Sequence, residues 1–472
     1  MRAGPRLPLL PFLSTLELAS AFFKVPCSNP LVVERADPII QPGIAASHVH
    51  TIMGGSGFGF SMDYNDTQAA QCSSCAPVAD KSNYWIPTLY YQAENGSFTS
   101  VEQDGGALIY YLQREDPNNS TILAPPKDLR MVAGSPMDRK YKNTPESDAR
   151  SYACLDYTGP AKPETNGFPN YNCPDGLRTQ VFFPSCWDGV NFDSEDHKSH
   201  MAYPNETYNA GPCPESHPVK IVSIFIEVIW RTEKFAEDWY GDGDSQPFVW
   251  SNGDKTGYGL HGDFINGWDV PVLQHALDTC DDPNGIIENC AALELYGDEV
   301  TEGCMLEPSI DEQVSGWLDA LPGCNPVQPG PDDAKSITTC SAPTAIDRPQ
   351  HYYTDVTGSL NWAWIGCARD NVDDQRVLSE SSSTGDDMTV QKCIQTCREN
   401  GYIYAGLEYA RECYCGNSIE ESKMPKAEPM GKCLSKCSGD ESQNCGGYAY
   451  IGLYKACGGK ECENLQYPGV PQ

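Results

Sequence analysis

Short runs of apolar residues in the N-terminal part of the chain predict β-strands. The clearest are Ala107–Gln113, Gln180–Phe183 and Ile221–Trp230, which are rich in β-branched or aromatic residues and have the length of ordinary strands. Helical spacing is confined to Val272–Asp278 and Gln313–Leu321. We therefore expect a mostly β, sandwich-like large domain.

A different pattern near the C-terminus predicts a small α+β domain. Four apolar or half-cystine residues between Met388 and Asn400 follow the i, i+3, i+4, i+7 spacing of one helix face: Val390, Cys393, Ile394 and Cys397. Gly401 ends this helix, and strand-like runs follow at Tyr402–Tyr409 and Tyr448–Tyr454. We expect one helix on a small antiparallel sheet, with the two helical cysteines joined to the strands.

The N-terminus resembles a secretion signal. Arg2 and Arg6 precede the largely apolar segment Leu7–Ala19, and Ala19-Ser20-Ala21 has the small-x-small pattern of a cleavage site. Residues 323–350 concentrate Pro, Gly, Asp and Ser, which is typical of a linker. The predicted division is a signal peptide at 1–21, a large domain at 22–324, a linker at 325–358, a small domain at 359–456 and a tail at 457–472.

The cysteine count points to an oxidising compartment. All 22 cysteines follow the signal segment, and this even number can pair completely. We expect a structural disulfide at Cys72 and Cys75, and disulfides that staple the loop-rich end of the large domain among Cys280, Cys290, Cys304 and Cys324. Glycosylation sequons begin at Asn65, Asn95, Asn118, Asn119 and Asn205. Without a later apolar run of about 18 to 20 residues, these features predict a secreted glycoprotein that is not in the membrane.

The net charge excludes one class of partner. The chain has 32 Lys and Arg residues and 65 Asp and Glu residues, which gives a formal net charge of −33. The sequence contains no cluster of basic residues. Such a chain repels nucleic acid and anionic lipid. Neutral polysaccharide is compatible with this charge, and we expect a monomer with no nucleic-acid or membrane partner.

Eight cysteines near the C-terminus carry a family resemblance. They are Cys367, Cys393, Cys397, Cys413, Cys415, Cys433, Cys437 and Cys445, and five of them lie in the phrases MTVQKCIQTC, YAGLEYARECYCGN and CGGYAYIGLY. This segment resembles a WSC domain, a disulfide-built carbohydrate-binding module of fungal cell-wall proteins. The resemblance implies binding to wall polysaccharide such as β-glucan, chitin or xylan.

Aromatic side chains would carry that binding, because sugar rings stack their C–H faces on Trp and Tyr. The small domain offers Trp362, Trp364 and Tyr409 among several aromatics. In a module this small, roughly two-thirds of the aromatics are expected to fill the interior.

The large domain places histidines and acids in three separate motifs. Four of the eight histidines form two pairs, His48-Val49-His50 and His197-Lys198-Ser199-His200. Side chains two apart on a strand, or three apart on a turn, share one face, as in many metal sites. Asp188 and Asp196 lie around the second pair, and a glycine-rich segment contains Asp254, Tyr258, His261 and Asp263. The three motifs could converge on one cleft.

Glu227 interrupts the apolar run Ile221–Trp230 in mid-strand. A carboxylate there is desolvated unless it is paired, which raises its pKa and suits it to general acid catalysis. A structural pair with Arg178 or Arg231 explains it equally well.

The motifs together carry a second resemblance. DPIIQPG with SHVHTIMGG, YWIPTLY, RTQVFFPSCWDGVNFDSEDHKSHMAYP and GYGLHGDFINGWD occur in order between Asp37 and Leu277. They resemble the fungal domain of unknown function DUF1996, whose members are secreted and often joined to a WSC domain. The resemblance implies no activity.

Three functions remain open for the large domain. In the first, Glu227 acts as acid and Asp188, Asp254 or Asp263 as base or nucleophile in glycan cleavage. In the second, a divalent metal, the only cofactor we consider, is held by residues of the two histidine pairs and an acid: His48, His50, His197, His200 and Asp196. In the third, the domain is a noncatalytic wall-binding or structural protein. In each case the expected substrate-binding residues of the large domain are His48, His50, His197, His200, His261, Trp187 and Tyr258.

Overall fold

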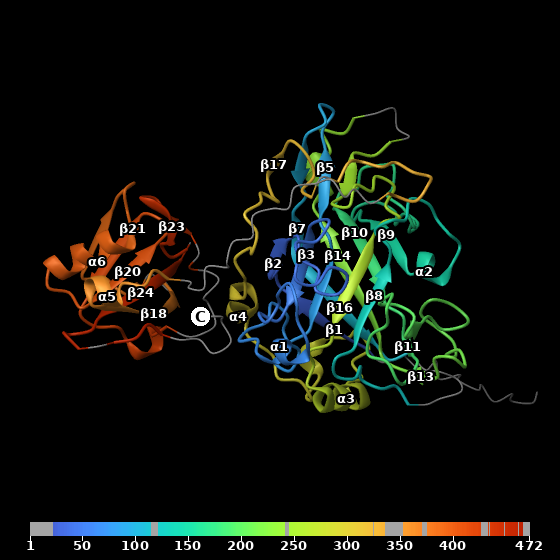
Figure 1. Cartoon of the computed structure of the whole chain (residues 1–472), viewed down its shortest axis with the longest axis horizontal. Coiled ribbons are helices and arrows are strands. Elements are labelled where there is room, and N and C mark those ends of the chain that lie inside the picture. Colours follow the sequence, from blue (N-terminus) through green and yellow to red (C-terminus); the bar gives the residue numbers. More distant parts are fainter. Residues whose placement is uncertain are drawn as a thin grey trace, which may run out of the picture.

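The computed structural model describes residues 22–114, 121–240, 245–323, 325–335, 353–370, 375–425, 433, 435–447, 449–460 and 462–465. Figure 1 shows two bodies, a large one built from the N-terminal part of the chain and a small one from the C-terminal part. The predicted signal peptide, as well as Cys324 and much of the predicted linker, lies outside the described residues.

Two five-stranded antiparallel sheets form the centre of the large domain. Sheet A has the order β1 (Phe22–Cys27), β7 (Gln103–Leu112), β14 (Ser223–Trp230), β10 (Leu177–Phe182) and β9 (Arg150–Cys154). Sheet B has the order β2 (Val32–Glu34), β3 (His50–Gly54), β4 (Asn83–Pro87), β16 (His261–Ile265) and β8 (Arg130–Gly134).

The two sheets pack face to face over one apolar cluster. A Cβ added to Gly262 of β16 would lie 3.1 Å from Val181 Cγ1 of β10, and the cluster includes Val181, Ile226 and Phe264. Because strand side chains alternate, neighbours of these residues point away from the interior. The mostly β fold class expected from the sequence is confirmed.

The outer face of sheet B is also buried. Ile52, Trp85, Val132 and Ile265 from four of its strands form a second apolar cluster with residues of the segment 31–62 and with Cys304. This cover encloses the part of sheet B that carries the candidate site.

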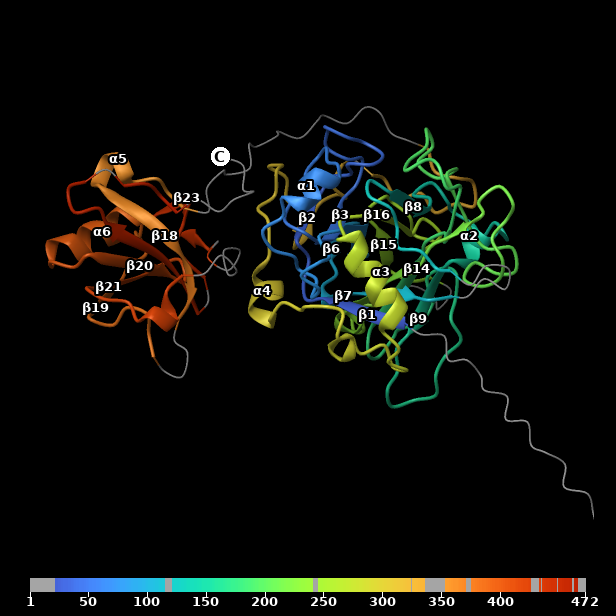
Figure 2. The same ribbon diagram turned by 90° about the horizontal axis from the view of Figure 1, so that it is seen from below.

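Smaller elements surround the sheets. A four-stranded sheet joins β15 (Phe248–Trp250), β5 (Leu89–Gln92), β6 (Phe98–Ser100) and β17 (Trp317–Leu318), and a three-stranded one joins β12 (Met201–Ala202), β11 (Cys186–Trp187) and β13 (Val219–Lys220). The helices are α1 (Tyr64–Gln68), α2 (Pro145–Asp148), α3 (Val270–Thr279), α4 (Asp298–Gly303) and the 3-10 turns η1 (Thr232–Phe235) and η2 (Ile287–Asn289). Seen from below, α3 lies across one end of the domain (Figure 2).

Of the two helices predicted here, one is present. The helix α3 begins where Asp269 accepts a hydrogen bond from the Val272 amide at 3.3 Å. The helix predicted at Gln313–Leu321 is wrong, because Gly316 has a φ of +73° and Trp317–Leu318 pair with β6 instead. Tertiary pairing here overrides the local pattern.

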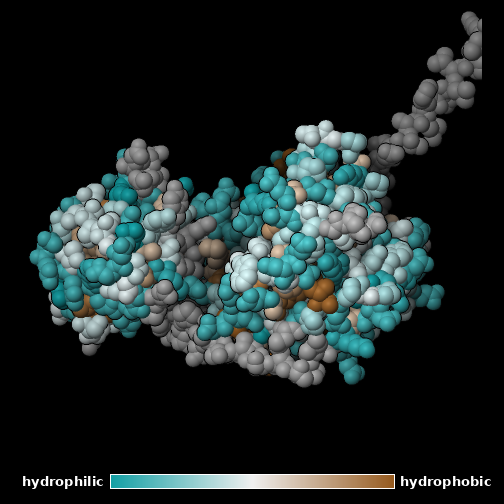
Figure 3. Space-filling model, turned by 90° about the horizontal axis from the view of Figure 1, so that it is seen from above, coloured by the Kyte–Doolittle hydropathy of each residue, from teal (hydrophilic) through white to brown (hydrophobic). Residues whose placement is uncertain are grey.

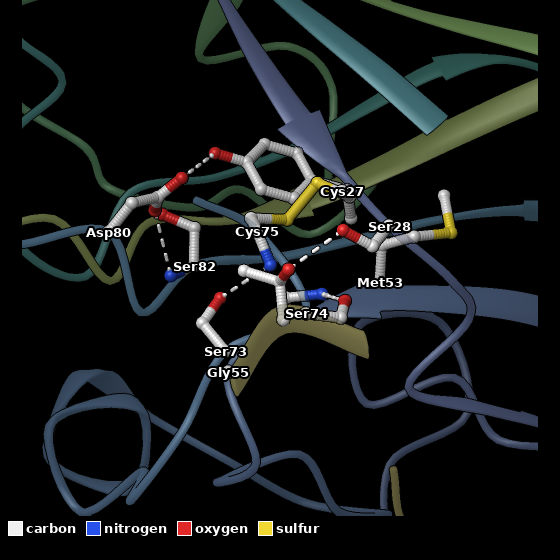
Figure 4. Close-up of a disulfide and its surroundings, with 12 residues drawn as sticks. Cys27, Ser28, Met53, Gly55, Ser73, Ser74, Cys75, Asp80 and Ser82 are labelled. Carbon is white, nitrogen blue, oxygen red and sulfur yellow. Dashed lines mark hydrogen bonds between the residues drawn. A yellow bond between two sulfur atoms is a disulfide. The ribbon is translucent and has the colours of Figure 1, made fainter. Parts of the chain in front are cut away.

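Disulfides tie distant segments of the large domain together. Cys72 and Cys75 are both bridged, although not to each other: Cys75 pairs with Cys27 and Cys72 with Cys304. Figure 4 shows the Cys27 bridge beside Ser28 and Ser74, whose backbone groups hydrogen-bond at 2.8 Å. The other bridges are Cys154–Cys173, Cys186–Cys213 and Cys280–Cys290.

The small domain is one main helix on a five-stranded antiparallel sheet. The sheet has the order β18 (Trp362–Arg369), β24 (Tyr450–Ala456), β20 (Tyr404–Glu408), β21 (Glu412–Gly416) and β19 (Ser381–Thr384). The helix α6 (Val390–Glu399) presents the four predicted residues to the core, and its cysteines bridge to β21 as Cys393–Cys413 and Cys397–Cys415. The remaining elements are α5 (Thr357–Leu360), η3 (Glu421–Lys423), β22 (Lys436–Cys437) and β23 (Asp440–Asn444).

Further bridges close the small domain: Cys367–Cys433, Cys437–Cys445 and Cys457–Cys462. No cysteine in the described part of the chain is free. No helix among the described residues is both long and apolar enough to span a bilayer. The face seen in Figure 3 is largely hydrophilic with small apolar patches, as the charge of the chain suggests.

Substituting Gly54 tests the close packing at the end of β3. Gly54 has a φ of +109°, and an added Cβ would lie 1.9 Å from the Ser82 carbonyl oxygen. Gly96 has a φ of +90° with nothing within 4 Å of its Cβ position. We expect Gly54→Ala to lower the free energy of unfolding by about 2–4 kcal/mol more than Gly96→Ala, measured by urea unfolding. Equal losses would contradict the packing.

Candidate metal centre and carbohydrate-binding surface

The sheet topology brings three histidines to one edge of sheet B. His50 is the first residue of β3 and His261 the first residue of β16. Both strands pair antiparallel with β4, which lies between them. They therefore run in the same direction and begin at the same edge. His48 precedes β3 by two residues and completes the group.

The ring nitrogens of these histidines converge. His48 Nε2 lies 3.0 Å from His261 Nε2, and His50 Nε2 lies 3.3 Å from the same atom. One ligand atom from each ring lies within 4.8 Å of the others. The residues are 5%, 0% and 3% exposed in the order His48, His50 and His261.

Backbone carbonyls fix the orientation of two rings. His50 Nδ1 lies 3.0 Å from the Ala36 carbonyl oxygen, and His261 Nδ1 lies 2.9 Å from that of Gly259. A carbonyl oxygen only accepts, so the proton of each neutral ring is on Nδ1 and the Nε2 lone pair is free. His48 Nδ1 lies 2.9 Å from Ser47 Oγ.

Burial keeps these rings neutral. It lowers the pKa of His50 to about 4 and that of His261 to about 3, and it lowers the pKa of His48 well below its ordinary value. His50 and His261 therefore direct two lone pairs at each other across 3.3 Å, with no proton to share.

A metal ion fits this arrangement. Imidazole nitrogens bind zinc at 2.0–2.1 Å, and two such nitrogens at the tetrahedral angle are about 3.3 Å apart. Metal-binding histidines usually donate their other N–H to a carbonyl or carboxylate, as His50 and His261 do here. Neutral imidazoles suit zinc, copper, iron and nickel.

Two buried carboxylates accompany the triad. Asp263, on the same strand as His261, is 1% exposed, and neither of its oxygens has a hydrogen-bond partner among the described residues. Burial, followed by the nearby charge of Asp37, raises its pKa well above the ordinary value. Asp37 is 5% exposed and accepts hydrogen bonds from the Ile39 and Ile40 amides.

The second histidine pair stands apart from the triad. His200 Nε2 lies 2.8 Å from the Arg130 carbonyl oxygen, and His197 Nδ1 lies 2.8 Å from an Asp193 oxygen. Asp196 accepts from the Ser199 amide and neighbouring groups, which lower its pKa. The structure thus brings together His48, His50 and His261, whereas His197, His200 and Asp196 make separate local contacts.

Lys198 nevertheless links this loop to the site. Its Nζ lies 2.5 Å from the Gly134 carbonyl oxygen and 2.5 Å from Glu146 Oε1. Gly134 pairs directly with His261 across β8 and β16.

The four acids suggested for glycan cleavage are not gathered. Val181 faces sheet B and pairs with Ile226, so the adjacent Glu227 projects from the opposite face of sheet A. Glu227 lies 3.7 Å from Arg178 Nε and 3.5 Å from the Tyr110 hydroxyl. Burial raises its pKa.

The other two acids have structural partners. Asp188 accepts hydrogen bonds from the Val190 and Asn191 amides in an exposed turn. Asp254 is fully buried 3.6 Å from Arg139 Nε. Neither residue belongs to a strand of sheet B, which carries Asp263.

Two further candidates of the large domain are only half-buried. Trp187 donates from Nε1 to the Asn191 carbonyl oxygen at 2.6 Å and stacks on the exposed Phe192 with ring centroids 5.9 Å apart. Tyr258 packs its ring against Gly167. Both present part of a ring at the surface.

In the small domain, the expectation for two tryptophans is wrong. Trp362 and Trp364 are each 2% exposed and belong to the apolar core, where Trp364 stacks on Tyr353. Their ring faces are covered and cannot stack on a sugar. Tyr409 is 55% exposed at the turn between β20 and β21.

A buried acidic pair lies beside this turn. Asp370 and Glu408 are 1% and 5% exposed, and Arg376 Nη1 lies 2.7 Å from a carboxylate oxygen of each. Arg376 also covers the Tyr414 ring at 4.2 Å. Burial, followed by the hydrogen bond and charge of Asp370, raises the pKa of Glu408 to about 7.

The sequence analysis named the three histidines of the triad only as members of larger candidate sets, and it missed Asp37 as a neighbour of the site. Asp37 lies in the motif DPIIQPG of the recognised family.

Comparison with known families covers both parts of the chain. Residues 37–268 match the family described as domain of unknown function DUF1996, and residues 364–447 match the WSC domain. Both resemblances stated from the sequence are confirmed. The WSC match supports carbohydrate binding, and together with the disulfides it indicates an extracellular or cell-surface protein.

Similar proteins share limited segments. A "WSC domain-containing protein" of Arthroderma benhamiae is 32% identical over 93 residues, which are 20% of this chain and 10% of that protein. "Kremen protein 1" of Homo sapiens is 36% identical over 99 residues, 20% of each chain. A "Putative fungistatic metabolite" of Chaetomium globosum is 28% identical over 198 residues, 39% of this chain and 84% of that protein. The chain thus spans only a small fraction of the first two.

The acidic pair of the small domain predicts a pH-dependent stability. Because the folded-state pKa of Glu408 lies above its ordinary value of 4.5, the folded domain holds this proton more tightly than the unfolded chain. Its stabilisation is present below pH 4.5 and is lost as the pH rises to about 7. We expect the small domain to lose on the order of 2–3 kcal/mol from this group between these values.

Thermal unfolding of the full chain at both pH values measures this loss. Glu408→Gln, which stays neutral, should show a smaller decrease, whereas Glu399→Gln at the exposed C-terminal end of α6 should behave like the wild type. A wild-type slope retained in Glu408→Gln would contradict the assignment.

Proposed function

Since the chain carries a DUF1996 domain followed by a WSC domain, we propose that it is a secreted wall protein whose WSC domain binds polysaccharide and whose large domain is a metal-dependent enzyme acting on that polymer. The expected polymer is a neutral fungal cell-wall glycan of the β-glucan, chitin or xylan type. The observation that carries the enzymatic part is the convergence of three neutral imidazoles at one edge of sheet B.

The protein supplies a preformed set of ligands. Ala36 and Gly259 carbonyls orient the rings of His50 and His261, and the strand register sets their spacing. Three protein ligands and an open fourth position are typical of catalytic zinc sites, whereas structural zinc sites are closed by four protein ligands. When bound, a divalent ion acts as a Lewis acid and lowers the pKa of a coordinated water.

Hydrolysis by a carboxylate pair is less well supported. That reaction needs an acid and a base flanking the bond, about 5–10 Å apart, but Glu227 projects from the far face of sheet A and contacts Arg178. The environment of Glu227 is that of a structural ion pair. Asp263 is the acid associated with the histidines.

Metal analysis tests the enzymatic proposal. The full chain, purified and incubated with zinc, copper or manganese, should retain about one equivalent of a metal after dialysis, and chelation should lower its Tm. His261→Ala should lose the metal, because it removes the nitrogen nearest to both partners. His275→Ala, on the exposed side of α3, is the matched control and should retain it. Wild-type protein without metal would leave only a wall-binding protein.

Retention on insoluble wall glycans tests the WSC domain. In the full chain, Tyr409→Ala should weaken binding about ten-fold, on the order of 1–2 kcal/mol for a lost stacking contact. The matched control is Ile403→Ala, which removes an apolar side chain that is 42% exposed. Equal binding of the two variants would assign recognition to another surface, and no retention of the wild type on any wall fraction would contradict polysaccharide binding.

A further inference from the structure

Asp263 is the least satisfied polar side chain of the candidate site. It lies in a cross-strand row with Ile52, Trp85 and Val132 on the outer face of sheet B. Both carboxylate oxygens are buried without a hydrogen-bond partner in the described structure. Burying such a group without a partner is unfavourable, and a molecule or ion beyond the described side chains would satisfy it.

A second unsatisfied group lies next to it. Trp85 is fully buried, and its Nε1–H, which can only donate, also has no partner in the part of the chain that the structure describes. Trp85 and Asp263 are directly paired residues of β4 and β16, so their side chains leave the sheet side by side on the same face. One hydroxyl-bearing molecule can donate to the carboxylate and accept from the indole.

This pair borders the histidine triad. Asp263 follows His261 by two residues and shares its face, about 6–7 Å along the strand. The charges of Asp37 and Lys198 act on both residues. The carboxylate is not among the ligand atoms that lie within 4.8 Å of one another. Asp263 is therefore a neighbour of the triad along the strand and not one of its converging ligands.

We infer that Asp263 and Trp85 hold the exchangeable, non-protein ligand of the ion bound by His48, His50 and His261, and that this ligand is a hydroxyl-bearing molecule. The inference rests on the proposed metal centre. The shared chemistry is an O–H group, whose source is water or a sugar hydroxyl of the polysaccharide. Asp263 and Trp85 are accordingly positioning residues for that group and do not ligate the metal themselves.

Cobalt(II) absorption of the full chain provides a direct test, because its visible bands report the coordination of the ion. Asp263→Asn should still bind about one equivalent of cobalt through the three histidines. Its bands should shift, and its affinity should fall about 10- to 100-fold, as for other groups that support metal ligands. Trp85→Phe, which keeps the aromatic ring and removes the N–H, should shift the same bands.

A matched buried acid supplies the control. Asp80 is fully buried and accepts hydrogen bonds from Tyr84 and Ser82, as Figure 4 shows for its contact with Ser82. Tyr84 belongs to the cluster between the sheets, on the other face from Trp85. Asp80→Asn should leave the cobalt bands and affinity unchanged.

The outcomes separate the two proposals. Wild-type bands that change when a soluble wall oligosaccharide is added support a sugar hydroxyl as the ligand, and unchanged bands support water. Cobalt bound by Asp263→Asn and Trp85→Phe with wild-type bands and affinity overturns the inference and leaves the metal centre standing. Wild-type protein that binds no cobalt overturns both proposals.

Discussion

The arrangement of the candidate site at the edge of sheet B depends on the hydrogen-bond partners of three imidazole rings. His50 and His261 use their Nδ1 protons on backbone carbonyls, so their Nε2 atoms can only accept. Two acceptors at 3.3 Å repel each other, and either a cation or an N–H of His48, whose Nε2 lies 3.0 Å from His261 Nε2, can relieve that repulsion. The strand register, the carbonyl contacts and the buried cover of residues 31–62 all hold this arrangement in place.

The same edge brings together motifs of the large domain that are far apart in the sequence. His48 precedes His261 and Asp263 by more than two hundred residues, yet antiparallel pairing through β4 brings these segments together. The loop that contains His197 and His200 lies alongside strand β8, where His200 contacts the Arg130 carbonyl and Lys198 contacts the Gly134 carbonyl. The motifs approach one another in this region, but only His261 of the glycine-rich segment joins His48 and His50.

The sequence predicts the parts of this protein in which local pattern and tertiary structure agree. The helix at Val390–Glu399 and the strand containing Glu227 follow their apolar spacing. The predicted helix at Gln313–Leu321 fails because Gly316 turns the chain and Trp317 pairs with a distant strand. Residue type alone also could not show that Trp362 is buried or that Glu227 faces away from the histidines, since both depend on which face of a sheet is covered.

In the proposed function, the WSC domain holds the polymer and the large domain carries the chemistry. The match to the WSC family supports carbohydrate binding, whereas the proposed activity of the large domain depends on a metal ion bound by its three histidines.

X-ray absorption spectroscopy of the zinc-loaded full chain measures the coordination of that ion most directly. The account predicts three imidazole nitrogens at about 2.0–2.1 Å with one further light atom. A first shell without histidine, or zinc bound with no defined shell, would contradict it.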